Sequence, residues 1–169
     1  MKQISAPILL VLMLVACTAR KNTVASAPAV HPYETIYNGN EKILKGLLVR
    51  SDIERDTTFK WFKENYQLGR ANAAAVEAFK KNGAKFSMIV FGGTWCEDTQ
   101  NLLPQFYRLA DNAGYPDSSI SLIGVDRSKN TLDNLSTAFD IINVPTFIVM
   151  KDGKEVGRVV EYGKYGEID

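Results

Sequence analysis

The chain has 169 residues, enough for one domain with a real core, and its 20 Lys plus Arg almost balance its 19 Asp plus Glu, for a formal net charge of +1. This balance leaves no basic patch for a nucleic-acid backbone, so we expect no nucleic-acid partner. The only histidine, His31, has no neighbouring residues with which to form a metal cluster, and we expect no metal and no cofactor.

The first 16 residues have the pattern of a bacterial lipoprotein signal peptide. Lys2 precedes an apolar run at 8–15 that is too short to span a bilayer of about 30 Å as a mature helix. Leu14-Val15-Ala16-Cys17 then resembles the lipobox that precedes an acylated cysteine. We predict a signal peptide at 1–16, a lipid on Cys17 and attachment to a membrane of the bacterial cell envelope. An uncleaved N-terminal anchor is the alternative.

Cleavage of the signal peptide and acylation of Cys17 together would leave one free thiol in the mature protein. Removing 16 of 169 residues leaves 153 and takes away one lysine, so the mature chain would have 19 basic and 19 acidic side chains and no formal charge. Acylation would use Cys17 and leave Cys96 as a lone thiol in an oxidising compartment. Residues 17–32, rich in Ala, Thr, Ser and Pro, predict a flexible tether ahead of a domain at 33–169.

Residues 33–85 are predicted to form an N-terminal extension that is mainly helical. Asp56 is expected to cap one helix, and Asn72 a second helix that ends at Gly83. Residues 43–50 have features of both a helix and a strand, and their structure stays open. We expect the helices of the extension to cover the sheet.

The core, at 86–161, alternates strands with helices. Strands are predicted at 86–91, 120–125, 146–150 and 155–160, and helices from residue 96 onward and over 131–139. Strands separated by a helix form a parallel pair, and the closing hairpin through Asp152-Gly153 adds an antiparallel edge. The sequence therefore predicts an α/β fold with a mixed β-sheet flanked by helices.

Cys96 is the candidate reactive residue because it stands where a helix begins. A buried strand is followed by Gly92-Gly93, and the helical pattern starts at Cys96. Unpaired N–H groups and the positive end of the helix dipole favour a thiolate over a thiol at this place. Glu97 and Asp98 bring negative charge that opposes the thiolate, so we expect a moderately reactive thiol.

The stretch Trp95-Cys96-Glu97-Asp98-Thr99 resembles the active-site loop of the thioredoxin superfamily, in which Trp-Cys-x-x-Cys opens a helix after the central strand. Pro104 stands at the place of the family's helix proline, and Val144-Pro145-Thr146 matches the loop whose proline is cis in the family. The resemblance covers about 86–161 and implies a thioredoxin-like fold. It also implies that Cys96 attacks substrate disulfides.

This chain departs from the family pattern at the second cysteine, which is Thr99. A mixed disulfide at Cys96 must therefore be released by a thiol from outside the site. Residues 162–169 are too few for the family's closing helix. Either the helices of 33–85 cover that face of the sheet instead, or the natural chain is longer than this sequence.

The resemblance further implies a substrate groove around Cys96. In the family, the residue before the cis proline offers its backbone to an extended substrate, and here that residue is Val144. Val144, Pro145 and Trp95 would form an apolar rim around the thiol, and Thr99 would at most donate a hydrogen bond to it. The alternative is that Pro145 only begins a strand and has no role with a substrate.

Three functions fit these observations. The first is a membrane-anchored, monomeric monothiol reductase or isomerase, in which Cys96 forms mixed disulfides with exported proteins or small thiols. The second is a non-catalytic binding module, favoured because Thr99, Val90 and Leu122 stand where the family has a cysteine, a buried acid and a lysine. The third is a thiol peroxidase, since Cys-x-x-Thr is similar to the Cys-Gly-x-Thr loop of glutathione peroxidases, although only Gln100 offers a match to that family's further site residues.

Overall fold

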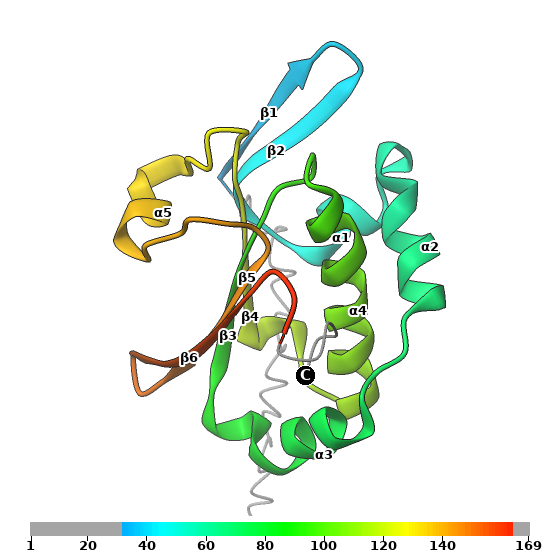
Figure 1. Cartoon of the computed structure of the whole chain (residues 1–169), viewed down its shortest axis with the longest axis vertical. Coiled ribbons are helices and arrows are strands. Elements are labelled where there is room, and N and C mark those ends of the chain that lie inside the picture. Colours follow the sequence, from blue (N-terminus) through cyan, green and yellow to red (C-terminus); the bar gives the residue numbers. More distant parts are fainter. Residues whose placement is uncertain (1–31, 164–169) are drawn as a thin grey trace, which may run out of the picture.

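The structure, a computed structural model, describes residues 32–163 and contains one six-stranded sheet in the order β1-β2-β4-β3-β5-β6 (Figure 1). Strands β3 and β4 are parallel, and every other neighbouring pair is antiparallel. The predicted mixed sheet is thereby confirmed. The strands are β1 (Tyr33–Asn38), β2 (Glu41–Leu48), β3 (Ser87–Gly92), β4 (Ile120–Gly124), β5 (Thr146–Lys151) and β6 (Lys154–Val160).

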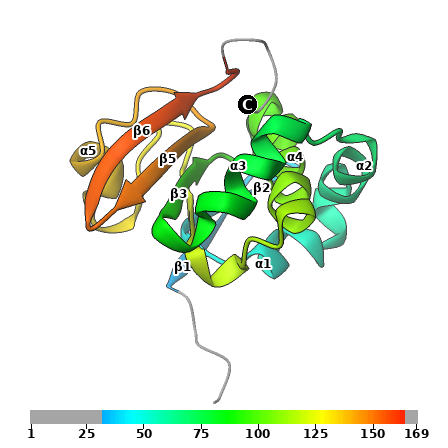
Figure 2. The ribbon, with the colours of Figure 1, turned by 90° about the horizontal axis from the view of Figure 1, so that it is seen from below.

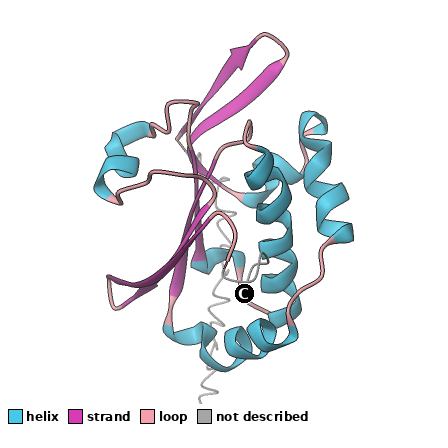
Figure 3. Cartoon of the chain, viewed as in Figure 1, coloured by secondary structure: helices cyan, strands magenta, loops and turns pink. Residues whose placement is uncertain are grey.

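Helices cover both faces of this sheet, unequally (Figures 2 and 3). Four of them lie on one face and α5 lies on the other, which confirms the predicted sheet flanked by helices. Because α2 and α3 pack against α4, helices of the N-terminal extension share the face of the helix that begins after Cys96. The helices are α1 (Arg50–Glu54), α2 (Lys60–Leu68), α3 (Ala73–Asn82), α4 (Glu97–Ala113) and α5 (Leu135–Ala138).

The extension contains a hairpin as well as the predicted helices. Residues 43–50, which fit two structures on sequence grounds, end strand β2 and begin α1. Pairing with β4 decides the outcome, and it brings the backbones close: a Cβ on Gly124 would lie 2.2 Å from the Leu44 carbonyl oxygen. Only glycine fits at that point. The hairpin β1–β2 therefore extends the sheet and continues beyond its edge (Figure 1).

The caps of the extension follow the prediction. The Asp56 side chain accepts a hydrogen bond from the Thr58 N–H at the turn that leads into α2, and the Asn72 side chain accepts from Ala74 and Ala75 at the start of α3. These side chains satisfy N–H groups that have no partner within the helix. Local sequence therefore sets where these helices begin.

The predicted helix over 131–139 is shorter than expected. Only Leu135–Ala138 is α-helical, after a 3₁₀ turn at Leu132–Asn134. Asp133 and Asn134 have φ values of 60° and 55°, in the left-handed region that breaks a right-handed helix. Asp and Asn tolerate that region better than other side chains, which is why the break falls there.

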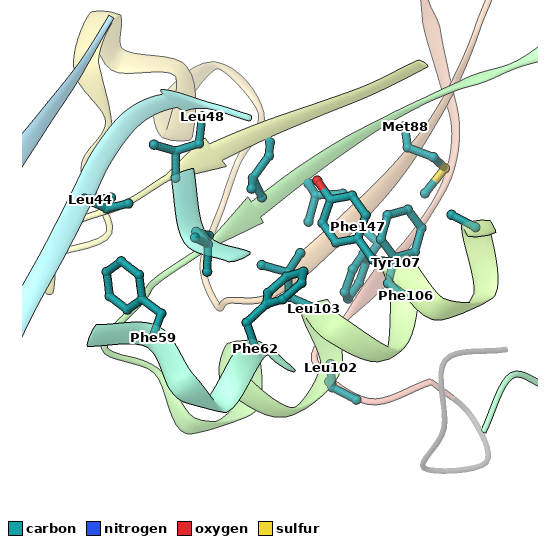
Figure 4. Close-up of a cluster of buried hydrophobic side chains, with 14 of the residues drawn as sticks. Leu44, Leu48, Phe59, Phe62, Met88, Leu102, Leu103, Phe106, Tyr107 and Phe147 are labelled. Atoms are coloured by element: carbon teal, nitrogen blue, oxygen red, sulfur yellow. The ribbon is translucent and has the colours of Figure 1, made fainter. Parts of the chain in front are cut away.

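The larger core lies between the sheet and helices α1 to α4 (Figure 4). The apolar face of α4 contributes five residues to it, of which Leu102, Leu103, Phe106 and Ala110 are at most 1% exposed and Tyr107 is 2% exposed. A smaller core on the opposite face lies between the sheet and α5. Its buried members are Phe91, Ile123, Val125, Val144 and Ile148, with Trp95 and Cys96 packed at its border.

Arg50 joins the extension to the far end of α4. Its guanidinium group lies 4.9 Å from the ring centre of Tyr107 and 5.3 Å from that of Tyr66, and it donates to both carboxylate oxygens of Asp111 at 2.9 Å. The hydroxyl of Tyr66 donates to the same carboxylate at 2.7 Å. Cation–π and ion-pair contacts therefore act together at the start of α1.

An ion pair ties β2 to the loop after β4. The Asp126 carboxylate accepts from Lys45 Nζ at 2.9 Å and from the backbone N–H groups of Ser128 and Asn130, both at 2.9 Å. Burial raises the pKa of Asp126, but the Lys45 bond and the two N–H groups lower it by more, so that the pKa lies below its ordinary value.

We expect Asp126→Asn to destabilise the protein at pH 7 but not in acid. A carboxyl whose pKa is lower in the folded state adds stability above its unfolded value of about 3.9, and this stability is lost as the pH falls through the folded pKa. Urea unfolding at pH 7 and near pH 3 measures the difference. If the free energies of unfolding of wild type and variant differed equally at both pH values, this account would be contradicted.

Candidate functional site

Cys96 lies at the carboxyl end of β3 and is the N-cap residue of α4. Its N–H donates to the Gly93 carbonyl at 2.9 Å, and its own carbonyl accepts from Gln100 at 2.9 Å, as in the first turn of a helix. The turn from β3 is tight: a Cβ on Gly93 would lie 2.7 Å from the ring of Trp95. Cys96 as a residue is half-buried.

The loop before β5 brings Val144 and Pro145 to the thiol. Their peptide bond is cis, as the resemblance predicts. Cys96 Sγ lies 3.2 Å from the Val144 carbonyl oxygen and donates to it. Two segments 48 residues apart in sequence therefore meet at the sulfur atom.

In the structure, the side chains of Val144 and Pro145 do not form the apolar rim that we expected around the thiol. The Val144 side chain is 2% exposed, because it points into the smaller core beside Phe91 and Ile148, and Pro145 is buried as well. Val144 therefore faces Cys96 with its backbone and not with its side chain.

Trp95 is held beside Cys96 from two directions. Its indole Nε1 donates to the Val125 carbonyl at 3.0 Å, just after β4. The guanidinium group of Arg127 lies 5.2 Å from its ring centre and is itself fixed by two bonds to Glu41, of 2.8 and 2.6 Å. Trp95 remains half-buried and is the aromatic side chain next to the thiol in sequence.

The Thr99 side chain is buried, and its hydroxyl is bound to the loop that precedes Cys96. It is 1% exposed, and its hydroxyl oxygen accepts from the Gly93 N–H at 3.2 Å. The structure thus places this oxygen on the loop backbone, where it stabilises the turn before Cys96. No hydrogen bond between Thr99 and the Cys96 sulfur is present within residues 32–163.

Sequence reasoning missed Thr94, which fastens the active-site loop to the hairpin. Its buried hydroxyl donates to the Lys42 carbonyl at 3.1 Å and accepts from the Leu44 N–H at 3.3 Å. Gln100 completes the arrangement, since its amide nitrogen donates to the Thr94 carbonyl at 2.9 Å. The partners of Thr94 are about fifty residues away in sequence, so no local pattern could have indicated them.

Tyr162 is a second residue that sequence reasoning missed. It follows β6, and its hydroxyl donates to Asp98 Oδ1 at 3.0 Å, in the first turn of α4. The pKa of Tyr162 is raised: the Asn101 side chain lowers it, but the Asp98 hydrogen bond, burial, and the charges of Asp98 and Cys96 raise it by more. The segment after β6 therefore reaches the surroundings of the thiol.

Within residues 32–163, no group of three or more His, Cys, Asp or Glu side chains is arranged to hold a metal ion. In the same range, no helix has the length and apolar character needed to cross a membrane. The predicted signal peptide, Cys17, His31 and all of the tether except its last residue lie outside the described residues.

A half-buried cysteine at the start of a helix, after a central strand and beside the carbonyl that precedes a cis proline, defines a thioredoxin-like protein. The family model described as thioredoxin matches residues 49–167, well over half of the chain. The chain belongs to the thioredoxin family.

Known proteins similar to this chain agree with that family. A thioredoxin-like protein, R548, from Acanthamoeba polyphaga mimivirus is 32% identical over 79 residues, which cover 47% of this chain and 55% of the relative. Thioredoxin H2-2 from Oryza sativa subsp. japonica is 34% identical over 83 residues, 49% of this chain and 58% of the relative. The chain thus spans little more than half the length of these relatives.

Solved thioredoxin structures are similar over a comparable part of the chain. The X-ray structure of Fasciola hepatica thioredoxin has 26% sequence identity and a TM-score of 0.37, and the match covers 50% of this chain and 75% of that one.

Proposed function

We propose that this protein is a monothiol thiol-disulfide exchange protein, of reductase or isomerase type, in which Cys96 forms mixed disulfides with exported proteins or small thiols. The observation that carries the proposal is the setting of Cys96: a half-buried thiol at the N-terminus of α4, 3.2 Å from the Val144 carbonyl. Helix N-termini stabilise thiolates, and the thiolate is the form that attacks disulfides.

The reaction would proceed in two exchanges. The Cys96 thiolate attacks one sulfur of a substrate disulfide, the S–S bond breaks, and the departing thiolate takes up a proton from water while a mixed disulfide forms at Cys96. An external thiolate, or a second thiol of the same substrate, then attacks the substrate sulfur and releases Cys96. With an external thiolate, the substrate is left in a disulfide with that external thiol. With a second thiol of the substrate, the disulfide is rearranged within the substrate.

The place of action follows from the N-terminal sequence. A lipid on Cys17 and a tether at 17–32 would hold a monomeric domain at a membrane of the bacterial cell envelope, where exported proteins form disulfides. Acylation would also remove the second thiol of the chain, so that Cys96 would act alone.

A non-catalytic binding module is the second candidate, favoured by two buried positions. Val90 is 0% and Leu122 is 2% exposed, and both are apolar where the resemblance would place an acid and a lysine to handle protons. The thiol peroxidase hypothesis has less support. Its one match to the further site residues of glutathione peroxidases is Gln100, and the amide nitrogen of Gln100 is already bound to the Thr94 carbonyl at 2.9 Å.

The proposal predicts a stoichiometric reaction that stops until thiol is added. With a chromogenic aromatic disulfide, the purified protein should release one thiolate per Cys96, retain the other half as an adduct visible by mass spectrometry, and lose the adduct when glutathione is supplied. Cys96→Ser should abolish the adduct at this site.

Reaction no faster than that of an unstructured cysteine peptide, or an adduct that glutathione does not release, would sink the exchange function and favour the binding module. Rapid formation of sulfenic acid at Cys96 with hydrogen peroxide, without disulfide exchange, would instead support the peroxidase.

A further inference from the structure

We propose that Tyr162 is a latch residue of the Cys96 site, whose hydrogen bond to Asp98 holds the segment Glu161–Tyr162, here called the strap, across the opening and restricts which reactants reach the thiol. The biological meaning of this latch rests on the proposed function, but the access that it controls is a property of Cys96 itself.

The strap is fixed at one end to the loop that contains the cis proline. The Glu161 N–H donates to the Pro145 carbonyl at 2.7 Å, directly after β6. Glu161 has a φ of 56°, in the left-handed region of backbone conformation that residues other than Gly, Asn and Asp rarely adopt. The chain therefore turns sharply at this residue and runs toward α4 (Figure 1).

The other end of the strap is fixed to the helix that carries the thiol. The Tyr162 hydroxyl donates to Asp98 Oδ1 at 3.0 Å, and Asp98 is two residues after Cys96 in the first turn of α4. A hydrogen bond to a carboxylate is stronger than one between neutral groups. The strap thus joins the two elements, the loop at Val144–Pro145 and the start of α4, between which Cys96 Sγ lies.

This position makes access to the sulfur depend on the strap. Tyr162 is 45% exposed and its hydroxyl is bound to Asp98, so it lies on the surface beside the first turn of α4 and is not a core residue. In the proposed latch, its side chain is part of the boundary of the site. A small reactant can reach a half-buried sulfur past such a boundary, whereas a reactant joined to a bulky group needs the boundary to move. Breaking the Tyr162–Asp98 bond should therefore favour large reactants selectively.

The test compares two reagents with the same reactive group and different size. Cys96 in the full-length protein is modified with N-ethylmaleimide or with a maleimide that carries a long poly(ethylene glycol) chain, and modification is followed at the Cys96 peptide by mass spectrometry, so that Cys17 does not contribute. In Tyr162→Phe, which keeps the ring, we expect the rate with the large reagent to rise roughly fivefold, the ratio that one net hydrogen bond of about 1 kcal/mol supports, and the rate with the small reagent to stay constant.

Controls separate the latch from other effects. Tyr37→Phe makes the same chemical change on β1, at a side chain that is 70% exposed, and should leave both rates unchanged. Asp98→Ala should raise the ratio of the large-reagent rate to the small-reagent rate as Tyr162→Phe does, and combining the two should not raise this ratio further, because they remove the same bond. The loss of the Asp98 charge changes both rates by the same factor and leaves the ratio unaffected.

Two outcomes would overturn the latch: unchanged rates in Tyr162→Phe, or rates that change by the same factor for both reagents, which would mean that Tyr162 acts on the charge of the thiol. Maleimide modification needs no disulfide chemistry. The test can therefore overturn the latch while the proposed disulfide exchange stands, and a failure of disulfide exchange would not overturn the latch.

Discussion

Thr99→Cys is expected to give this protein its own resolving thiol and to make the release of substrate from Cys96 independent of external thiol, although the intramolecular disulfide that results must be reduced from outside before the next cycle. In the wild type, the position three residues after Cys96 carries a hydroxyl, which cannot attack a mixed disulfide. A sulfur at this position would attack the Cys96 sulfur, form an intramolecular disulfide and release the substrate as a thiol.

The geometry favours this exchange. Residues three apart in the first turn of a helix have Cβ atoms about 5–6 Å apart, and a disulfide needs Cβ atoms about 3.5–4.5 Å apart, so the two side chains must approach each other by about 1–2 Å. Thr99 is buried against Gly92, and cysteine is smaller than threonine, so the new side chain fits without displacing its neighbours. The cost is the hydrogen bond between Thr99 and the Gly93 N–H.

The measurement is the lifetime of a mixed disulfide between Cys96 and glutathione. An intramolecular thiol with an effective concentration of even about 10 mM should release glutathione roughly 100-fold faster than about 0.1 mM of added thiol does. Thr99→Ser, which keeps the hydroxyl and adds no sulfur, is the matched control and should behave as wild type. A Thr99→Cys protein whose adduct still waits for added thiol would show that position 99 cannot reach the Cys96 sulfur.

Local chemistry explains which parts of the fold were predictable. The Asn72 cap, the Asp152-Gly153 turn and the start of a helix at Cys96 depend on neighbours within a few residues, and each is found as predicted. Residues 43–50 could not be assigned because pairing with β4, far along the chain, decides their structure. The break at Asp133 and Asn134 had a local signal, since these residue types tolerate a positive φ.

The site divides in a similar way. Cys96, Trp95 and the cis proline follow from a family pattern, and the structure brings Cys96 and the Val144–Pro145 loop together. The direction of the Val144 side chain could not be read from sequence, because an apolar residue next to a turn can face the core or the solvent. Thr94 and Tyr162 act through hydrogen bonds to distant segments, which no spacing in the sequence marks.

Phe106→Ala is expected to cost about 3–5 kcal/mol of unfolding free energy, the usual range for removing a buried aromatic ring. Phe106 is 1% exposed on α4, and its ring centre lies 5.1 Å from that of Phe147 on β5 and 6.4 Å from that of Phe79 on α3. Its loss would open a cavity between the sheet and the helices on this face (Figure 4).

Since whole domains are stable by only about 5–15 kcal/mol, this loss is a large part of the total stability, and the variant should unfold at a clearly lower urea concentration than wild type. Urea unfolding measures the change, and Leu68→Ala, at a leucine that is 77% exposed on α2, should stay within about 0.5 kcal/mol of wild type. Equal effects of the two substitutions would mean that α4 does not pack through Phe106. In the fraction of Phe106→Ala that remains folded, Cys96 should react at the wild-type rate, because Phe106 supports the helix and does not contact the sulfur.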